Sequence, residues 1–393
     1  MLELFFEYQR GYLKKVERYP YKRYMHKSIK FQNRLTGLLG ARGVGKTTFL
    51  LQYLKEIDIE DKKKLYISVD NLEIDSLFEI ASYFEKTGGK LLVVDEIHKY
   101  QDFELELKKI YDILDIKIIF SGSSALQLDN SKADLSRRAV IYYVKGLSFR
   151  EFLEFKTGDK FQAYSLDTIL KDHIKIAGDI CEKVKPFEYF TEYLKYGYYP
   201  FYFENEDEYL LKLSQTINTV IEVDIPAIFP IEYKNLINLK KLVKLICISK
   251  PFKVNLKELM QKMGLNDYKS LYRLLDYLDK AKILSVVKSQ AKGDTVFSKP
   301  DKLYLNNTNL LFAYCKNSEV GTIREIFFNS MFDEVLTLAK GDFLIDEKYT
   351  FEVGGKGKSF KQIKDVRHSF VVSDDIEVGY KQKIPLYLFG FLY

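Results

Sequence analysis

The stretch GLLGARGVGKTT, residues 37–48, decides the fold of the N-terminal part of this chain of 393 residues. It follows an apolar run and fits the pattern G-x-x-x-x-G-K-[ST] from Gly40 to Thr47. A loop of this kind points several backbone N–H groups inward, and its glycines leave room for phosphate oxygens to approach them. The pattern predicts a phosphate-binding loop made of Gly40, Ala41, Arg42, Gly43, Val44, Gly45, Lys46, Thr47 and Thr48.

Short apolar runs alternate with helical patterns around and after this loop. The runs that predict strands are 34–40, 64–70, 90–96, 117–123 and 139–144. The segments between them place apolar residues at i, i+3 and i+4, which indicates helices. Buried strands that alternate with helices are typical of a parallel sheet covered on both faces. We therefore expect an α/β fold here, in the form of a parallel-sheet P-loop NTPase domain.

An acidic pair, Asp95 and Glu96, ends the strand predicted at 90–96. The carboxyl ends of parallel strands meet at one edge of the sheet, where the phosphate-binding loop is also expected. Lys46 is then expected to reach the β- and γ-phosphates, while Thr47 and Asp95 hold Mg²⁺. Glu96 is expected to orient and polarise the attacking water. The alternative is that the acidic pair only caps the following helix.

These roles predict ATP and Mg²⁺ as the cofactors. Guanine recognition would require the pattern [NT]KxD directly after a strand. The nearest match, SKAD at residues 131–134, begins with serine and lies several residues beyond the fourth predicted strand. The sequence therefore favours ATP.

Other polar residues near the predicted strand ends leave two interpretations each. Ser123, in SGSS, either senses the γ-phosphate or belongs to a plain turn. Arg137 and Arg138 precede the fifth predicted strand. They either stabilise charge on a phosphoryl group, in the same subunit or in a neighbouring one, or form a solvated surface pair. His98 is expected to be a surface residue at a helix start, and the alternative is a catalytic residue.

The remainder of the chain has a different pattern. Helical segments fill the region from 148 to about 280, then two strand-like pieces flank a loop that contains Gly and Lys. Three helices and a two-stranded flap predict a winged helix-turn-helix, and a small α/β region follows it. The predicted domains are 1–155 (P-loop ATPase), 156–234 (helical connector), 235–312 (winged helix) and 313–393 (small α/β).

Four stretches resemble the AAA+-related ATPases of archaea and bacteria: GARGVGKTTFLLQYL, LLVVDEIHKYQDFELELKKIYD, KIIFSGSSALQL and LSRRAVIYYVKGLSFREFLEF. The likeness covers residues 30–155, and YLKYGYYP at 193–200 matches the family's tyrosine–glycine–proline turn. The resemblance implies an ATP-binding domain, a winged helix after the connector, and a C-terminal fold similar to restriction-type nucleases. By this likeness the ATPase roles fall on Lys46, Thr47, Asp95, Glu96 and Ser123. The family has no single settled substrate.

The predicted winged helix has features of a DNA-binding module. The basic and aromatic side chains that it could place on DNA are Lys269, Tyr272, Arg273, Lys292 and Lys299. Asp276 and Asp279, on the same predicted helix, weaken the positive field. Winged helices also dock proteins, so both DNA and protein partners stay open.

Three acids in the last region match the order of a restriction-type nuclease site. Glu325 lies on a predicted helix, Asp342 opens a strand, and Glu352 lies on the next one. Together they could hold one or two Mg²⁺ ions that activate water. The nuclease pattern requires a lysine at position 354, which is glycine here, and the nearest candidate is Lys356. Both an active nuclease and a nuclease-like scaffold that only binds therefore stay open.

Composition sets the remaining limits. A 47% hydrophobic share with 30% charged residues is typical of a globular protein, and the net charge of +6 permits but does not require nucleic-acid contact. Cys181, Cys247 and Cys315 are odd in number and far apart, so we expect no disulfide and a reducing, cytoplasmic location. The N-terminus does not have the pattern of a signal peptide, and we expect no membrane contact. The run IPLYLFGFLY, residues 384–393, is too short for a membrane span and predicts a buried final strand.

These observations favour a Mg²⁺-dependent switch or motor that binds and hydrolyses ATP and acts on DNA through its C-terminal half. Two alternatives remain. One is a signalling NTPase whose winged helix docks a protein partner, and the other is an ATP-gated nuclease. Self-association also stays open.

Overall fold

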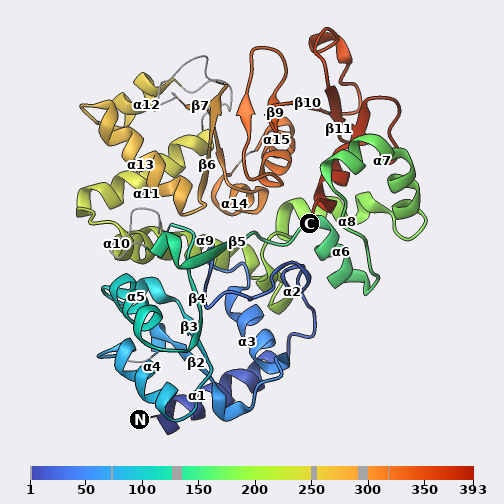
Figure 1. Ribbon diagram of the computed structural model, residues 1–393. Coiled ribbons are helices and arrows are strands. Elements are labelled where there is room, and N and C mark those ends of the chain that lie inside the picture. The colour runs from blue at the N-terminus through green and yellow to red at the C-terminus, as the bar shows by residue number, and fades with distance from the viewer. Residues whose placement is uncertain (1, 72–73, 126–134, 249–254, 291–299, 317) are drawn as a thin grey trace. The chain divides into compact units, whose positions relative to one another are not determined.

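The computed structural model describes residues 2–71, 74–125, 135–248, 255–290, 300–316 and 318–393 (Figure 1). The chain forms two compact units. The first contains Met1–Gly146 and Thr219–Pro230, and the second contains Leu147–Asn218 and Ile231–Tyr393. These units differ from the four predicted domains, because the segment at 219–230 folds with the N-terminal unit.

A five-stranded parallel sheet forms the centre of the first unit. Its strands are β1 (Leu35–Gly40), β2 (Lys64–Ser68), β3 (Leu91–Asp95), β4 (Lys117–Ser123) and β5 (Ala139–Val144). They are arranged in the order β2-β3-β4-β1-β5, and every pairing is parallel. Every residue of β1, β2 and β3 is buried, which explains why these strands read as continuous apolar runs. The predicted parallel α/β fold is confirmed.

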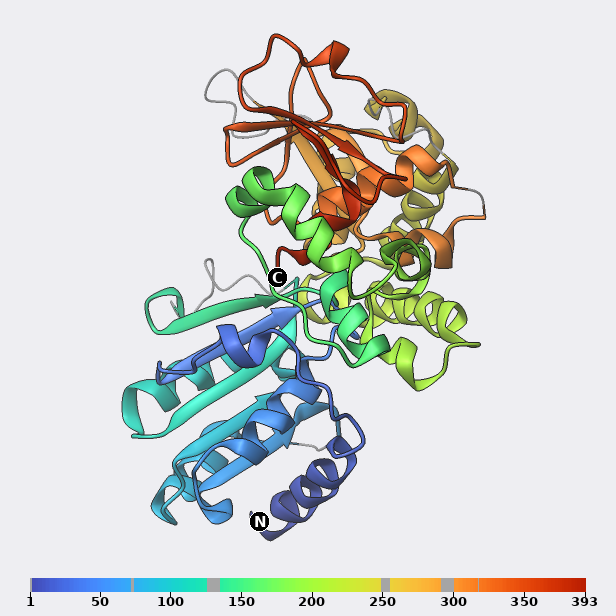
Figure 2. The same cartoon turned by 90° about the vertical axis from the view of Figure 1, so that its right-hand side faces the viewer.

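Helices flank both faces of this sheet (Figure 2). The helical elements of the first unit are α1 (Leu2–Val16), α2 (Met25–Ser28), α3 (Lys46–Glu56), η1 (Asp61–Lys63), η2 (Val69–Asn71), α4 (Leu77–Lys86), η3 (Ile97–Lys99), α5 (Phe103–Ile113), η4 (Leu135–Arg137), the π-helical turn η6 (Val220–Asp224) and α10 (Ile225–Ile228). The helices α4 and α5 pack against each other, while α1 contacts both α3 and β2. The core between α4, α5 and the sheet is aliphatic and aromatic, with Phe84 and Phe120 fully buried. This packing fixes the strand ends that carry the polar residues.

The second unit begins with helices around an aromatic core. The helical elements are α6 (Phe149–Thr157), α7 (Leu166–Cys181), α8 (Pro186–Tyr196), η5 (Pro200–Glu204), α9 (Tyr209–Thr219), α11 (Tyr233–Ile248), α12 (Leu256–Met263), α13 (Tyr268–Lys280), α14 (Thr308–Tyr314), α15 (Val320–Ser330), η7 (Phe360–Gln362) and η8 (Leu386–Phe391). Ser148 and Glu151 form a capping box that starts α6. The buried ring of Phe149 then packs against Phe190 and Phe391, with ring centroids 5.1 and 5.9 Å away.

A mixed seven-stranded sheet completes the second unit. Its strands are β6 (Leu284–Ser289), β7 (Pro300–Leu305), β8 (Leu336–Thr337), β9 (Phe343–Ile345), β10 (Tyr349–Gly354), β11 (Ser369–Ser373) and β12 (Lys383–Pro385). They follow the order β12-β11-β10-β9-β8-β6-β7. The hairpin β6–β7 is the predicted flap, and β6 also pairs in parallel with β8. One sheet therefore crosses the predicted border between residues 312 and 313. Lys292 and Lys299 lie outside the described residues.

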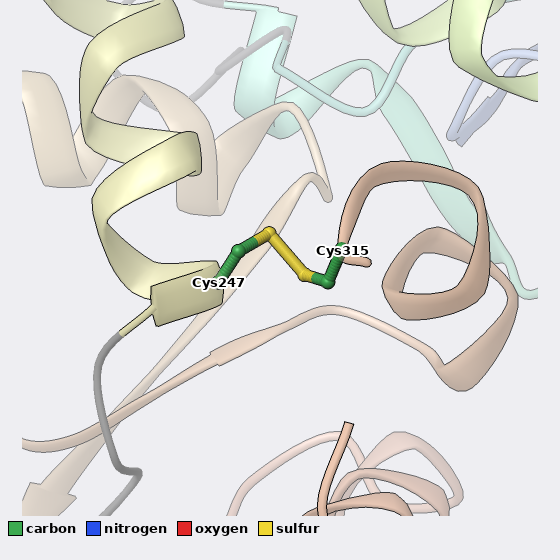
Figure 3. The surroundings of a disulfide bond; sticks show 2 residues. All are labelled: Cys247 and Cys315. Carbon is green, nitrogen blue, oxygen red and sulfur yellow. A yellow bond between two sulfur atoms is a disulfide. The ribbon is translucent and has the colours of Figure 1, made fainter. Parts of the chain in front are cut away.

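The prediction that the cysteines form no disulfide is wrong. Cys247, in the last turn of α11, is bonded to Cys315, the residue after α14 (Figure 3). The two residues are 68 positions apart, with Cα atoms at 5.2 Å, and only the packing of α11 beside α14 brings them together. Cys181 is free. The expectation of a reducing compartment loses its basis, because it depended on the absence of a disulfide.

The last apolar run is buried but is mostly not a strand. Only residues Lys383–Pro385 form β12, and the run then continues as the 3₁₀ helix η8. In the part of the chain that the structure describes, no helix is long and apolar enough to cross a membrane.

Candidate functional site

Glycines at three positions of the phosphate-binding loop are required by its geometry. The loop runs from the end of β1 at Gly40 to the start of α3 at Lys46. Gly43 and Gly45 have φ values of 86° and 93°, a left-handed conformation that other residues rarely adopt. A Cβ atom on Gly40 would lie 2.6 Å from the carbonyl oxygen of Val144. The strand–loop–helix context that the sequence motif requires is therefore present.

Lys46 is buried, although it is a lysine. Its ammonium group donates hydrogen bonds to the carbonyl oxygens of Gly40 at 2.9 Å and Ala41 at 3.2 Å. Outside the loop, the buried guanidinium of Arg23 donates to the carbonyl oxygens of Val44 at 2.7 Å and Gly146 at 2.6 Å. Arg23 therefore holds the loop through the carbonyl group of Val44. Sequence analysis missed this role because the arginine precedes the motif.

Asp95 accepts hydrogen bonds from three hydroxyl groups. Thr47 and Tyr66 donate to its Oδ2 atom at 2.6 and 2.7 Å, and Ser121 donates to its Oδ1 atom. The structure thus brings together Asp95 and Thr47, as the sequence predicts. Tyr66 and Ser121 were missed: Tyr66 lies inside an apolar strand, and in the stretch SGSS (residues 121–124) only Ser123 was considered. Burial and the neighbouring Asp95 carboxylate raise the pKa of Tyr66, so its hydroxyl group remains a donor at neutral pH.

Glu96 follows Asp95 in a left-handed conformation, with φ of 58°. Its backbone N–H donates to the hydroxyl of Ser121 at 3.2 Å, and its side chain is 19% exposed. The carboxylate Oε2 atom lies 3.6 Å from Nε2 of His98. The prediction of a surface histidine is wrong, because the His98 side chain is only 1% exposed. Its Nδ1 atom accepts the backbone N–H of Ser123 at 3.3 Å.

A buried carboxylate from the segment 219–230 also lies close to the His98 side chain. Asp224, on η6, pairs with Nη1 of Arg42 at 2.9 Å, and its Oδ1 atom lies 4.0 Å from Nε2 of His98. Burial on its own raises the pKa of Asp224, but the neighbouring His98 ring and the charge of Arg42 together outweigh it and lower the pKa. Sequence analysis missed Asp224, which lies 182 residues after Arg42.

The structure does not bring Arg137 and Arg138 to the phosphate-binding loop of their own unit. Arg138 pairs with Asp112 at 2.9 Å and directly precedes β5. The first residue of β5 pairs with Leu35, at the amino end of β1, whereas the loop follows Gly40 at the carboxyl end. A strand of this length spans about 17–20 Å. The two arginines therefore lie at the opposite edge of the sheet from the loop.

In the second unit, the ammonium group of one lysine contacts two of the three predicted acids. The ammonium group of Lys302, on β7, lies 3.0 Å from Oε2 of Glu325 and 3.4 Å from Oδ1 of Asp342. Glu325 also accepts a hydrogen bond from Tyr304. Lys302 and Tyr304 belong to the predicted winged helix, so sequence analysis did not associate them with these acids.

The third acid has its own lysine, and it is not the predicted one. Glu352 is buried, and its Oε1 atom pairs with the ammonium group of Lys358 at 2.5 Å. The side chain of Lys356 is exposed. Asp342 lies beside Glu352 and accepts the backbone N–H of Val353 at 2.9 Å. Burial raises the pKa of Glu352.

The expected gathering of the three acids around a metal ion is not observed. Across the described residues, no group of three or more His, Cys, Asp and Glu side chains is placed to hold a metal ion. Two lysine ammonium groups instead pair with these acids, Lys302 with Glu325 and Asp342 and Lys358 with Glu352. This arrangement corrects the prediction of a second Mg²⁺ site.

The helix α13 presents its basic residues to solvent. Lys269 and Arg273 are exposed and Tyr272 is half-buried, whereas its leucines are buried. Asp276 pairs with Lys280 at 2.5 Å, so its charge is partly neutralised.

Two segments of the chain match known protein families. Residues 32–153 match the family described as an AAA domain (AAA_14), and residues 187–320 match a domain of unknown function (DUF8612). The sheet order and the phosphate-binding loop agree with the first match: this part of the chain is an AAA-type P-loop ATPase domain. ATP binding is implied by that class of domain. The second match carries no functional description.

Comparison with whole proteins adds no further function. The uncharacterized protein MJ1637 of Methanocaldococcus jannaschii is 27% identical, over 88% of this chain and 81% of that protein. The Walker-type ATPase PABY2304 of Pyrococcus abyssi is 14% identical with a TM-score of 0.43, over 78% of this chain and 95% of that chain. AMPPCP-bound DnaA from Aquifex aeolicus is 16% identical with a TM-score of 0.25, over 64% and 82%. Likenesses this distant do not indicate what the second unit does.

Proposed function

We propose that the first unit binds Mg²⁺-ATP and hydrolyses it. The observation that carries this proposal is the pairing of Thr47 with Asp95 beside the phosphate-binding loop, where buried Lys46 also lies. Hydroxyl and carboxylate oxygens are the ligands that Mg²⁺ prefers. The oxygens of Thr47 and Asp95 would therefore hold the ion, directly or through water, and the ion would neutralise charge on the phosphates.

The residues around the loop have separate roles in the proposed hydrolysis. Lys46 would exchange its carbonyl partners for phosphate oxygens, since both carbonyls belong to the loop itself. Glu96, partly exposed at the end of β3, would orient the attacking water. Ser123, at the end of β4, would sense the γ-phosphate. A charge-stabilising arginine, Arg137 or Arg138, would have to come from a neighbouring subunit.

The experiment that tests this function is steady-state phosphate release by the full chain with Mg²⁺-ATP. The Asp95→Asn variant should lose most of this turnover because the change removes a metal-binding charge. Asp61→Asn is the matched control, since Asp61 lies in the same unit and its side chain is 87% exposed. Equal turnover by wild type and Asp95→Asn would refute the assignment.

The trans role of the arginines has its own test. Mixing an Arg138→Ala variant with a Glu96→Gln variant should restore part of the turnover if neighbouring subunits complete each other's sites. The same mixing is repeated with Arg137→Ala. An absence of rescue for both arginines would remove them from the mechanism.

We propose further that the second unit binds DNA without cutting it. Two exposed cations on one face of α13, Lys269 and Arg273, support binding. The ammonium group of Lys302 between Glu325 and Asp342 argues against cutting, because it takes the position of a cation there.

Binding and cutting are tested separately. Neutralising Lys269 and Arg273 should weaken DNA binding and reduce the slope of its salt dependence by about one for each phosphate that is no longer neutralised. Lys262→Gln on α12 is the control. Supercoiled DNA with Mg²⁺ and ATP should stay intact. Cleavage that disappears in Glu352→Gln would instead identify an ATP-gated nuclease. ATP turnover that DNA does not change, without DNA binding, would favour the protein-docking alternative.

A further inference from the structure

His98 is a buried histidine whose hydrogen position is fixed by its surroundings. Its Nδ1 atom accepts the backbone N–H of Ser123, so Nδ1 carries no hydrogen in this arrangement. The hydrogen of the neutral ring is therefore on Nε2. This Nε2 atom is fully buried and has no hydrogen-bond partner within the described part of the chain. A buried N–H donor without an acceptor is energetically unfavourable. The Nε2–H group of His98 is therefore a donor that still requires an acceptor.

Two carboxylates face that donor. Oε2 of Glu96 lies 3.6 Å from Nε2, just beyond hydrogen-bond distance, and Oδ1 of Asp224 lies 4.0 Å from it. Asp224 already has a charged partner, because Arg42 pairs with it at 2.9 Å. A small rotation of the Glu96 side chain would therefore complete the hydrogen bond from His98.

The position of Glu96 explains why such a bond would matter. Its backbone N–H is held by Ser121, but its carboxylate is partly exposed at the edge of the site. A side chain with free rotation directs a water molecule poorly, since orientation errors of about 1 Å reduce rates by about 100-fold. A fixed N–H donor beside the carboxylate would limit that rotation.

We propose that His98 is a positioning residue that orients the carboxylate of Glu96 toward the attacking water. This inference rests on the proposed ATP hydrolysis. Ser123 sets the ring through its backbone N–H, and the opposite ring nitrogen holds Glu96. The end of β4 is thereby connected to the acid that follows β3. Asp224 is the competing acceptor for the same N–H, so a ring that turns toward Asp224 releases Glu96.

The test compares two substitutions of His98 by turnover and by ATP affinity from calorimetry. His98→Leu removes the donor and should lower kcat about 10- to 100-fold, while ATP affinity changes less than about threefold. His98→Gln should recover part of kcat, because its amide N–H can reach the position of Nε2–H. His173→Leu, which replaces a buried histidine in the second unit, is the matched control.

A further pair of variants isolates the path through Glu96. In the Glu96→Gln background, His98→Gln should cause no additional loss of turnover, because residues that act as one unit are not additive. This comparison also serves if His98→Leu does not fold. An additional loss equal to that in wild type would overturn the proposal.

Three other results would also overturn it: wild-type kcat in His98→Leu, no recovery in a folded His98→Gln, or a loss of ATP affinity parallel to the loss of kcat. In each of these three cases the wild-type protein still hydrolyses ATP, so only the role of His98 is refuted. An absence of turnover in the wild type itself would remove the proposed hydrolysis together with this inference, and so is distinguishable from the other three.

Discussion

Replacement of Lys46 by alanine tests the phosphate-binding loop most directly. The ammonium group is buried and contacts two carbonyl oxygens of the loop, at 2.9 and 3.2 Å. Bound ATP would replace these neutral acceptors by charged phosphate oxygens. The substitution therefore removes a charge-assisted interaction that exists only with nucleotide, along with two hydrogen bonds of the nucleotide-free protein.

The expected effects on binding and on stability differ in size. A hydrogen bond to a charged group contributes about 1.5–3 kcal/mol. Its loss corresponds to about 10- to 150-fold weaker ATP binding. The folded protein should lose no more than about 1 kcal/mol of unfolding free energy, because solvent can replace a hydrogen-bond donor at a site opened by alanine. The carbonyl of Gly40 also keeps a second donor, the backbone N–H of Ser124 at 3.1 Å.

Isothermal titration calorimetry with Mg²⁺-ATP measures the first effect and urea unfolding the second. Lys64→Ala is the matched control, since Lys64 is also a buried lysine of the first unit and, among the described residues, its ammonium group pairs only with Asp61, at 3.1 Å. It should bind ATP like the wild type. Unchanged affinity in a folded Lys46→Ala variant would refute the assignment of the loop. Equal losses in Lys46→Ala and Lys64→Ala would show that the effect is one of stability.

Three other predictions concern separate parts of the chain. Glu96→Gln keeps the shape of the side chain and should bind ATP within about threefold of wild type while turnover falls about 100-fold or more; wild-type turnover would contradict the role of this acid. The folded-state pKa of Asp224 is lowered, so its pairing with Arg42 should stabilise the protein above the unfolded pKa of about 3.9 and lose this effect as pH falls through the folded pKa. Asp224→Asn should therefore lower the free energy of unfolding, measured with urea, by about 1–2 kcal/mol at pH 7 and by less at pH 3. The expected loss is small for a charged pair because the Arg42 side chain is 34% exposed. An equal loss at both pH values would contradict this link between the Asp224 pKa and stability. Cys247→Ser should lower the unfolding free energy of the oxidised protein by about 2–4 kcal/mol, whereas Cys181→Ser should not; the same stability with and without a reductant would argue that the disulfide contributes nothing.

The sequence by itself determined the parts of the fold that depend on neighbours along the chain. The loop from Gly40 to Thr47 is recognisable because its glycine positions and its lysine are fixed by local backbone geometry. The strands of the first sheet are recognisable because β1, β2 and β3 are buried on both faces and therefore read as apolar runs. Asp95 was placed correctly for the same reason, since it ends such a run.

Local patterns were less informative about the kind of structure a buried run adopts. IPLYLFGFLY is buried as expected, but most of it forms the 3₁₀ helix η8. Apolar composition indicates removal from water, which a short helix achieves as well as a strand does. In the same way, the flap β6–β7 was predicted, but its pairing with β8 was not.

Only the tertiary structure decided which distant side chains meet. It places Asp224 against Arg42, Lys302 between Glu325 and Asp342, and Cys247 on Cys315, and each of these groups joins different elements of the fold. It also places Arg138 at the amino edge of the sheet, away from the loop. The physical reason is that charge pairing and disulfide formation depend on distance in space, and that distance is set by how buried surfaces pack. Spacing along the chain carries no record of it.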